Sequence, residues 1–211
     1  MSILDDLRKS VINGDLNATQ DQVQTAVAEN LPPEKILTDG LIAAMNEVGK
    51  LFENGEFFIP EMLVSARAMK GGLAILRPKL AAEDIQPIGR VVIGTAQGDL
   101  HDIGKNLVGM MLEGAGFEVI DLGVDVSPEK YVAAVKEHQP DLLGISALLT
   151  TTMPRMRDVL LALQATGLRE TVKVMIGGAP LTAQYASDIG ADIYAPDAAS
   201  AAQRARQLMQ V

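Results

Sequence analysis

The stretch that decides the fold is VVIGTAQGDLHDIGKN, residues 91–106. Its first six residues, Val91–Ala96, form a short β-branched run of the kind found in buried parallel strands. A polar loop that contains Gly98 follows, and Ile103–Gly114 then has the apolar spacing of a helix. A strand, a glycine-containing loop and a helix in this order predict one unit of an α/β sheet.

The same alternation continues to the end of the chain and predicts an α/β domain over residues 91–211. Four further apolar runs read as strands: Glu118–Leu122, Leu142–Leu148, Val172–Ile176 and Asp192–Tyr194. The other helical stretches are Pro128–His138, Met153–Thr166, Leu181–Ile189 and Ala198–Met209. Five strands of this type predict a doubly wound, flavodoxin/Rossmann-like parallel sheet, which binds ligands beyond the carboxyl ends of its strands.

The N-terminal part has a different period. Leu4, Leu7 and Val11 are spaced as on one helix face, and helices are also expected from about 18 to 29, from 33 to about 55, and from Pro60 onward. Pro78 is expected to kink or end the last of these. Four helices with short connections predict an antiparallel four-helix bundle over residues 1–84. Residues 85–90 lack periodicity and are predicted to be a linker.

Composition excludes several functions. The formal net charge is -9 and no basic cluster occurs, which argues against nucleic-acid binding. Every apolar run is too short to span a bilayer, so no membrane association is expected. The absence of cysteine excludes disulfides, thiolate metal sites and a cysteine nucleophile. The first apolar pattern contains charged residues, unlike a signal peptide, and a cytoplasmic location is therefore the default expectation.

The loop after the first strand contains one of only two histidines, His101, in a position where α/β sheets bind ligands. Asp99 can accept a hydrogen bond from one imidazole nitrogen and leave the other free for a metal. One histidine and one aspartate cannot build a zinc site. A metal held by a macrocycle needs only one axial protein ligand. Taken alone, the pair also fits a loop histidine beside an aspartate. His138 lies near a helix end and is expected on the surface.

Three motifs together resemble the signature of cobalamin-binding domains. They are Asp99-x-His101-x-x-Gly104, then Ser146-x-Leu148, then Gly177-Gly178, and all follow predicted strands in the same order as in that family. Residues 48–52, VGKLF, and the segment 55–70 are similar to the helical cap of methionine synthase and of the methylamine, methanol and methoxyaromatic corrinoid proteins. The resemblance covers nearly the whole chain and implies a helical bundle stacked on a Rossmann-like cobalamin domain.

The resemblance implies a role for each matching residue. His101 would replace the benzimidazole of the cofactor as the lower axial ligand to cobalt, the base-off/His-on state. Asp99 would orient His101, and Thr152 stands where the relative has the serine of a ligand triad. The displaced nucleotide tail would enter a slot between sheet and helices. The residues expected to bind the cofactor are Gly98, Asp99, His101, Asp102, Ile103, Gly104, Ser146, Leu148, Thr150, Thr152, Gly177, Gly178, Tyr194, Asp197 and Ala198.

The upper face of the cofactor would be covered by the helical half. Phe52, Phe58, Ile59 and Met62 match the apolar cap over the group bound to cobalt. Burial there would exclude water from a reactive cobalt–carbon bond. Without the resemblance, these four residues are ordinary residues of a bundle core.

The function implied is that of a methyl carrier. Cobalamin or a related corrinoid, in its methylcobalamin form, would take a methyl group from one methyltransferase and pass it to a second, which delivers it to a thiol or a pterin. A reductive activator is a further implied partner. The chain would catalyse nothing alone, since the cofactor supplies the chemistry and the protein supplies ligation and shielding.

Three alternatives remain open from the sequence. An adenosylcobalamin mutase has a similar cobalamin subunit, but one that resembles only the C-terminal half. Cobalamin-dependent sensors and regulators have a similar helical cap but carry an additional DNA-binding domain. A flavodoxin-like module that binds another ligand would leave His101 without a role.

Overall fold

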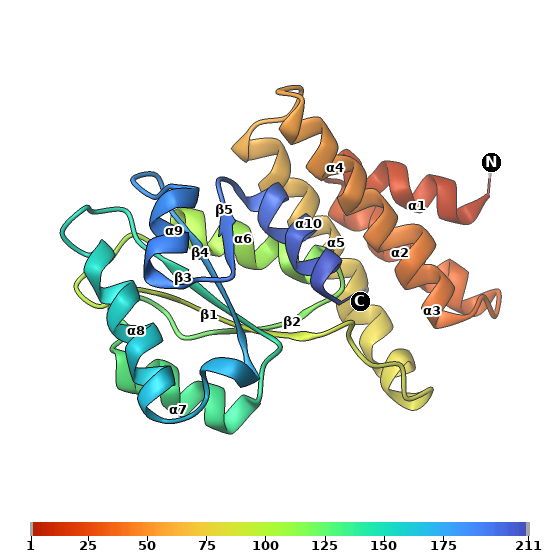
Figure 1. Ribbon diagram of the computed structural model, residues 1–211. Helices are drawn as coiled ribbons and strands as arrows, with labels where there is room; N and C mark the ends of the chain where they lie inside the picture. Colours follow the sequence, from red (N-terminus) through yellow and green to blue (C-terminus); the bar gives the residue numbers. More distant parts are fainter. Residues whose placement is uncertain (1, 210–211) are drawn as a thin grey trace. The chain divides into compact units, whose positions relative to one another are not determined.

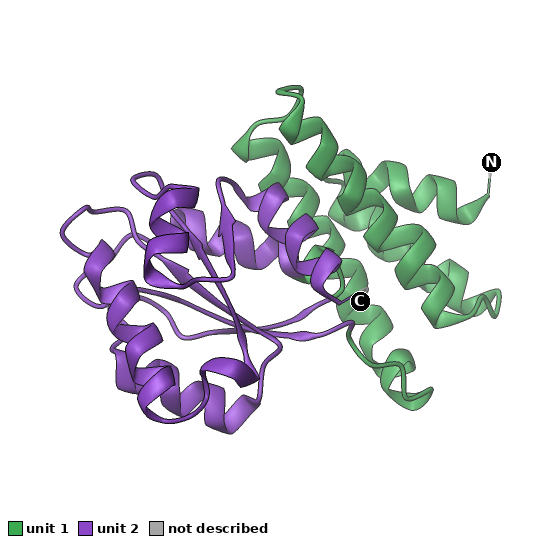
Figure 2. Ribbon diagram, viewed as in Figure 1, with its two compact units in different colours: residues 1–87, 113–116 green, residues 88–112, 117–211 purple. Residues whose placement is uncertain are grey.

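A computed structural model describes residues 2–209 of the chain. It divides into two compact units, shown in Figures 1 and 2. The first contains residues 1–87 together with 113–116, and the second contains residues 88–112 and 117–211. Each unit has its own hydrophobic core, as expected of an independently packed region.

The first unit is a bundle of helices. Its elements are α1 (Ile3–Ile12), α2 (Leu16–Ala28), α3 (Pro33–Lys35), the π-helical segment η1 (Ile36–Ile42), α4 (Ala43–Glu53) and α5 (Ile59–Ala82). Because α3, η1 and α4 follow one another without a break, the unit consists of four helices, as predicted. Ser2 and Asp5 form a capping box at the start of α1, and Asp15 caps α2. No helix described between residues 2 and 209 is long and apolar enough to cross a bilayer.

Pro78 does not end its helix, contrary to one of the two expected outcomes. It lies inside α5, which continues to Ala82. A proline lacks the backbone N–H and so removes one hydrogen bond of the helix. Pro78 lies about one turn before the end of α5 at Ala82. Leu76 and Leu80 are both buried on either side of it. Burial of these two side chains therefore favours a continued helix over the local preference of proline. The π-helical turn at η1 was not predicted either.

The second unit contains a parallel five-stranded sheet in the order β2-β1-β3-β4-β5. The strands are β1 (Arg90–Thr95), β2 (Glu118–Asp121), β3 (Leu142–Ser146), β4 (Lys173–Gly177) and β5 (Ile193–Ala195). All four neighbouring pairs are parallel. The predicted fold class, a helical bundle followed by a doubly wound five-stranded sheet, is confirmed.

Helices cover both faces of this sheet. They are α6 (Ile103–Gly114), α7 (Pro128–His138), α8 (Met153–Ala165), α9 (Ala183–Ile189) and α10 (Ala198–Leu208), with a short 3₁₀ turn, η2 (Arg169–Thr171), before β4. Side chains from α7, α8 and α9 share one buried core with Val92, Leu143 and Val174 of the strands. Figure 1 shows α6 and α10 on the other side from α7 and α8. Right-handed crossovers require this distribution when the strand order reverses at β1 and β3.

The strand order reverses at one place in the described sheet. The chain leaves β1 toward β2 but leaves β3 toward β4, so the loops after these neighbouring strands diverge. Such a switch point opens a space at the carboxyl edge of the sheet. Thr95, Ser146, Gly177 and Ala195 lie side by side along this edge, in register across four strands.

Two tyrosines allow a test of the packing of the second unit. Tyr131 of α7 is fully buried, and its hydroxyl has no hydrogen-bond partner within the described chain. Tyr185 of α9 instead donates to the carbonyl of Met153 at 2.7 Å. Since an unsatisfied buried hydroxyl costs free energy, Tyr131→Phe is expected to raise the free energy of unfolding by about 1 kcal/mol. Tyr185→Phe, as the matched control, should lower it by about 1 kcal/mol. Urea denaturation of both variants measures this, and a loss of stability in Tyr131→Phe would contradict it.

Candidate functional site

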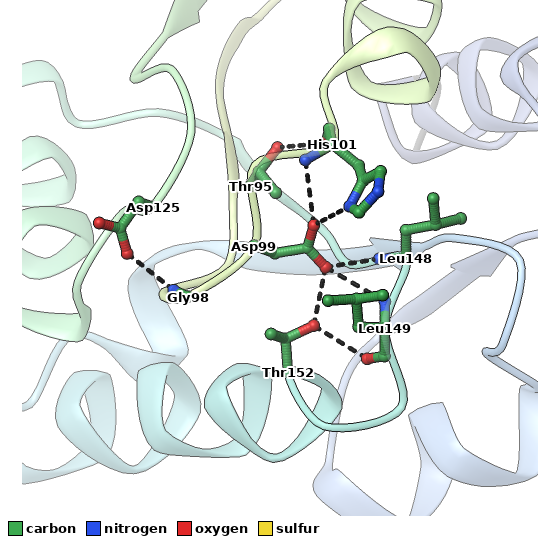
Figure 3. A network of polar contacts seen from close by, with 8 residues as sticks. All are labelled: Thr95, Gly98, Asp99, His101, Asp125, Leu148, Leu149 and Thr152. Carbon is green, nitrogen blue, oxygen red and sulfur yellow. Dashed lines mark hydrogen bonds and ion pairs between the residues drawn. The ribbon is translucent and has the colours of Figure 1, made fainter.

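The candidate site lies at the switch point between β1 and β3. The β1–α6 loop contributes Asp99 and His101, and the β3–α8 loop contributes residues 148–152 (Figure 3). Asp99 is completely buried, whereas 51% of the His101 side chain is exposed. The two loops therefore meet around a buried carboxylate that lies beneath an accessible imidazole.

Both oxygens of Asp99 are saturated with hydrogen bonds. Oδ1 accepts from the backbone N–H of His101 at 3.0 Å and lies 2.7 Å from its Nδ1. Oδ2 accepts from the backbone N–H groups of Leu148 and Leu149 at 2.8 and 3.2 Å, and from Thr152 Oγ1 at 2.7 Å. Figure 3 shows that the donors come from both loops. A buried carboxylate is tolerated only with such compensation.

These hydrogen bonds keep Asp99 ionised. Burial by itself would raise the pKa of Asp99, because a low dielectric disfavours the charged form. The hydrogen bonds from Thr152, from the N–H groups of His101 and Leu148 and from the imidazole outweigh burial and hold the pKa well below its ordinary value. The carboxylate is therefore an acceptor only, at every pH at which the protein would function.

An ionised Asp99 decides the tautomer of His101. Since the carboxylate can only accept, Nδ1 must carry the proton in their 2.7 Å contact. In the neutral ring, Nε2 is then left with its lone pair, the form in which histidine binds metals. The backbone of the same residue is also held, because Thr95 Oγ1 donates to the His101 carbonyl at 3.1 Å.

Thr152 completes a chain of side chains from the protein interior to the imidazole. Its hydroxyl lies 2.7 Å from Asp99 Oδ2 and 2.9 Å from the Leu149 carbonyl, so its single proton has two acceptors. The methyl group that distinguishes threonine from serine faces Gly98, where an added Cβ would lie 3.7 Å from it. That distance is an ordinary van der Waals contact, so the extra methyl group meets no clash at Gly98, and threonine keeps the contact with Asp99.

The surroundings of His101 are apolar although they are exposed. Leu100, Ile103, Leu148 and Leu149 are 70%, 75%, 43% and 42% exposed. At Gly104 an added Cβ would meet nothing within 4 Å. Residues 2–209 contain no group of three or more potential metal-ligating side chains. A single free imidazole nitrogen with an apolar surround fits a metal that brings its other ligands in a large, partly apolar macrocycle, and it does not fit a bare ion.

The carboxyl edge of the sheet beside this loop is built from small residues. Gly178 has a φ of 140°, and a Cβ there would lie 1.9 Å from the Ala147 carbonyl oxygen. A Cβ at Gly177 would approach the Ala195 carbonyl oxygen to 3.1 Å. With Ser146 beside Gly177 in register, the edge offers backbone atoms and one hydroxyl, with little side-chain bulk. An elongated ligand could lie close to the backbone there.

Two further predicted residues lie on the loops that carry the site. Asp102 lies just before α6, and its carboxylate accepts a hydrogen bond from Asn106 Nδ2, in the first turn of that helix, at 3.0 Å. Thr150 is exposed on the loop before α8. Both side chains are therefore near the switch point, and neither takes part in the hydrogen bonds around Asp99.

The predicted residues in β5 and just after it have structural roles of their own. Asp197 caps α10 by accepting from the Ser200 N–H at 2.8 Å. Ala198, the first residue of that helix, is buried. Tyr194 packs against the core that β1, β3 and β4 share with α7, α8 and α9. These contacts keep the loop between β5 and α10 at the carboxyl edge of the sheet.

The four predicted cap residues all belong to the first unit. Phe58 and Ile59, at the start of α5, are 64% and 45% exposed, and Phe52 at the end of α4 is partly buried. Met62 is completely buried within its unit. Phe58 and Ile59 are thus two adjacent exposed apolar side chains, whereas Met62 belongs to the core of the bundle.

Sequence reasoning did not find three residues that shape the site. They are Thr95, which binds the His101 carbonyl, Leu149, whose N–H reaches Asp99, and Asp125, which accepts from the Gly98 N–H at 2.7 Å. Asp125 follows β2, the neighbour of β1, so its position at the same edge was the available signal. The Leu149 contact is made by its backbone N–H, so the identity of the residue could not have indicated it.

Comparisons with known proteins agree with this geometry. Residues 89–204 match the B12 binding domain family, and residues 3–77 match a second family, also described as a B12 binding domain. Dimethylamine corrinoid protein 3 of Methanosarcina acetivorans is 44% identical over 207 residues, which cover 98% of this chain and 97% of that protein.

Two solved structures are similar over almost the whole chain. The crystal structure of the methanol:cobalamin methyltransferase complex MtaBC from Methanosarcina barkeri contains a chain with a TM-score of 0.89 and 30% identity, covering 99% of this chain and 80% of that one. A cobalamin-binding protein from Desulfitobacterium hafniense DCB-2 has a TM-score of 0.81 and 31% identity, covering 97% and 98%.

The lowered pKa of Asp99 predicts how stability depends on pH in the ligand-free protein. Below the ordinary value of 3.8, the unfolded chain takes up a proton at Asp99 that the native chain does not bind. The contribution of Asp99 is therefore fully present above pH 3.8 and declines as the pH falls further. Asp99→Asn should lower the free energy of unfolding at about pH 7 by about 2 kcal/mol, and this difference should shrink below about pH 4. Urea denaturation from about pH 3 to about pH 7 measures it; a difference independent of pH would refute the assignment.

Proposed function

The chain belongs to the family of corrinoid proteins with B12 binding domains, and on this premise we propose that it binds a corrinoid through His101 and carries a methyl group. The observation that supports this best is the free Nε2 of His101. Its partner nitrogen is held by buried Asp99, and the two loops of the site carry exposed apolar side chains. That combination suits the lower face of a macrocycle whose metal lacks one axial ligand.

Asp99 and Thr152 act through the imidazole. Asp99 keeps the proton on Nδ1, directs Nε2 outward and increases the basicity of the ring as a ligand. Thr152 donates to the other carboxylate oxygen and holds it in place. The three side chains form the proposed ligand triad.

The proposed binding mode is base-off/His-on. His101 takes the lower position, and the displaced nucleotide tail lies along the small-residue edge of the sheet. Ser146 and Thr150 are proposed to supply hydroxyl groups for this tail, and the backbone of Gly177 and Gly178, at the same edge as Ser146, is proposed to contact it. The further contacts proposed for the cofactor are Gly98, Asp102, Ile103, Gly104, Leu148, Tyr194, Asp197 and Ala198.

Methyl transfer requires partners on two sides. When bound, the corrinoid supplies a cobalt centre that accepts a methyl group from one methyltransferase and yields it to another. The proposed acceptor is a thiol or a pterin, and a reductive activator restores the cofactor after oxidation. In the first unit, the exposed Phe58 and Ile59, with Phe52, are proposed to exclude water from the upper face.

The extent of the similarity favours this function over that of a mutase subunit. The dimethylamine corrinoid protein matches 98% of the chain, which includes the helical bundle. A subunit that resembled only the C-terminal half would leave residues 3–77 unmatched, yet they match a B12 binding domain family.

Ligation by His101 can be tested by absorption spectroscopy. The protein, His101→Ala and His138→Ala are each reconstituted with methylcobalamin. Wild type and His138→Ala should give the same His-on spectrum, since the His138 side chain lies at the end of α7 and away from the ligand loop. His101→Ala should give a base-off or benzimidazole-bound spectrum. Identical spectra for all three proteins would show that His101 is not the ligand.

The carrier function can be tested by methyl transfer. The reduced corrinoid-loaded protein is mixed with methanol- or methylamine-specific methyltransferases and their donors, and formation of the methylated corrinoid is followed by absorbance. At least one donor system should methylate it, and free cobalamin at the same concentration should react at least about tenfold more slowly, because the partner recognises the protein. Failure with every donor system, with the His-on spectrum intact, would exclude the carrier function while leaving corrinoid binding in place.

A further inference from the structure

One aspartate outside the ligand triad has an unusual backbone conformation. Asp125, in the loop between β2 and α7, has a φ of 52°, a left-handed value that few residues other than glycine adopt. Such a conformation costs free energy and persists where surrounding contacts enforce it, often at functional sites. Its own contacts show what enforces it.

Asp125 binds the backbone on both sides of Asp99. Its carboxylate Oδ1 accepts from the Gly98 N–H at 2.7 Å (Figure 3). Its backbone N–H donates to the Asp99 carbonyl at 3.0 Å. The neighbouring Val126 donates its N–H to the Thr95 carbonyl at 2.9 Å. The β2–α7 loop thus extends the sheet pairing to the point where the ligand loop begins.

The carboxylate of Asp125 fixes one peptide group in the ligand loop. Residues 96–99 form a tight turn closed by the Asp99 N–H to the Ala96 carbonyl at 3.0 Å. Gly98, its third residue, has a φ of 81°, the value of a type II turn. Type I and type II turns differ by a flip of the central peptide, and that peptide contains the Gly98 N–H. An acceptor at Asp125 therefore favours the type II orientation.

We propose that Asp125 is a positioning residue for His101: it holds the turn before Asp99 in the orientation from which the Asp99 carboxylate reaches the imidazole. This inference rests on the proposed corrinoid ligation by His101. The hydrogen bonds of Asp125 are to the backbone of Gly98 and Asp99 and not to the imidazole, so its effect should appear in the strength of axial ligation and not in the binding of the nucleotide tail.

Substitutions can separate the hydrogen bond from the backbone conformation. Asp125→Gly keeps the positive φ without cost and removes the acceptor. Asp125→Asn keeps an acceptor oxygen and a residue type that tolerates positive φ. Asp84→Gly is the matched control, because Asp84 has a φ of 54° but belongs to the first unit, where its carboxylate accepts from Gln86.

The probe is aquacobinamide, a corrinoid that has no nucleotide base, so a nitrogen ligand to its cobalt must come from the protein. Its binding is titrated by absorbance for each variant. Amide hydrogen exchange of Gly98, His101 and Leu148 in the corrinoid-free protein provides the second readout, since all three N–H groups donate to Asp125 or Asp99.

Asp125→Gly should bind aquacobinamide about fivefold more weakly, the consequence of losing one hydrogen bond from the loop, and should lose exchange protection at Gly98 and His101. Asp125→Asn and Asp84→Gly should stay within about twofold of wild type, a change smaller than one hydrogen bond. Wild-type affinity and protection in Asp125→Gly would overturn the proposal, as would an Asp125→Asn variant as weak as Asp125→Gly. If His101→Ala binds aquacobinamide like wild type, the proposed ligation itself fails, a result distinct from either outcome.

Discussion

The site depends on one buried charge. A carboxylate without access to water is strongly unfavourable unless donors replace its hydration. Asp99 meets this requirement by drawing hydrogen bonds from two loops that lie far apart in the sequence. The loops after β1 and β3 must therefore adopt one relative arrangement for the charge to be buried at all. The orientation of His101 follows from that arrangement.

The sheet topology determines where such a charge can be placed. In the described sheet, β1 and β3 are the only neighbouring strands whose connections run away from each other, and ligands bind at such switch points. Along the same edge, Gly177 and Gly178 leave no room for a side chain, because a Cβ would meet the carbonyl oxygens of Ala195 and Ala147. The position of the imidazole and the bare edge beside it thus both follow from one strand order.

Much of this could be predicted from the sequence because the relevant signals are local. Strand–helix alternation predicted the sheet, and the Asp99-x-His101 pair predicted a contact that the structure places at 2.7 Å. What could not be predicted depends on contacts between distant segments or on the backbone. The Leu149 N–H that binds Asp99 would be the same with any other side chain. The contact of Asp125 with the ligand loop depends on the pairing of β2 with β1, which joins distant parts of the sequence. Pro78 stays helical because burial of Leu76 and Leu80 outweighs the local preference of proline.

In the proposed ligation, the atoms that orient His101 are separate from the atom that would bind cobalt. All the hydrogen bonds that orient His101 involve Nδ1 or the backbone, and none of them uses Nε2. The ring is therefore held in one tautomer and direction in the ligand-free protein, and the proposed coordination at Nε2 would break none of these hydrogen bonds. For a carrier that must exchange its cargo with two partners, this rigidity confines each change to the cofactor side of the imidazole.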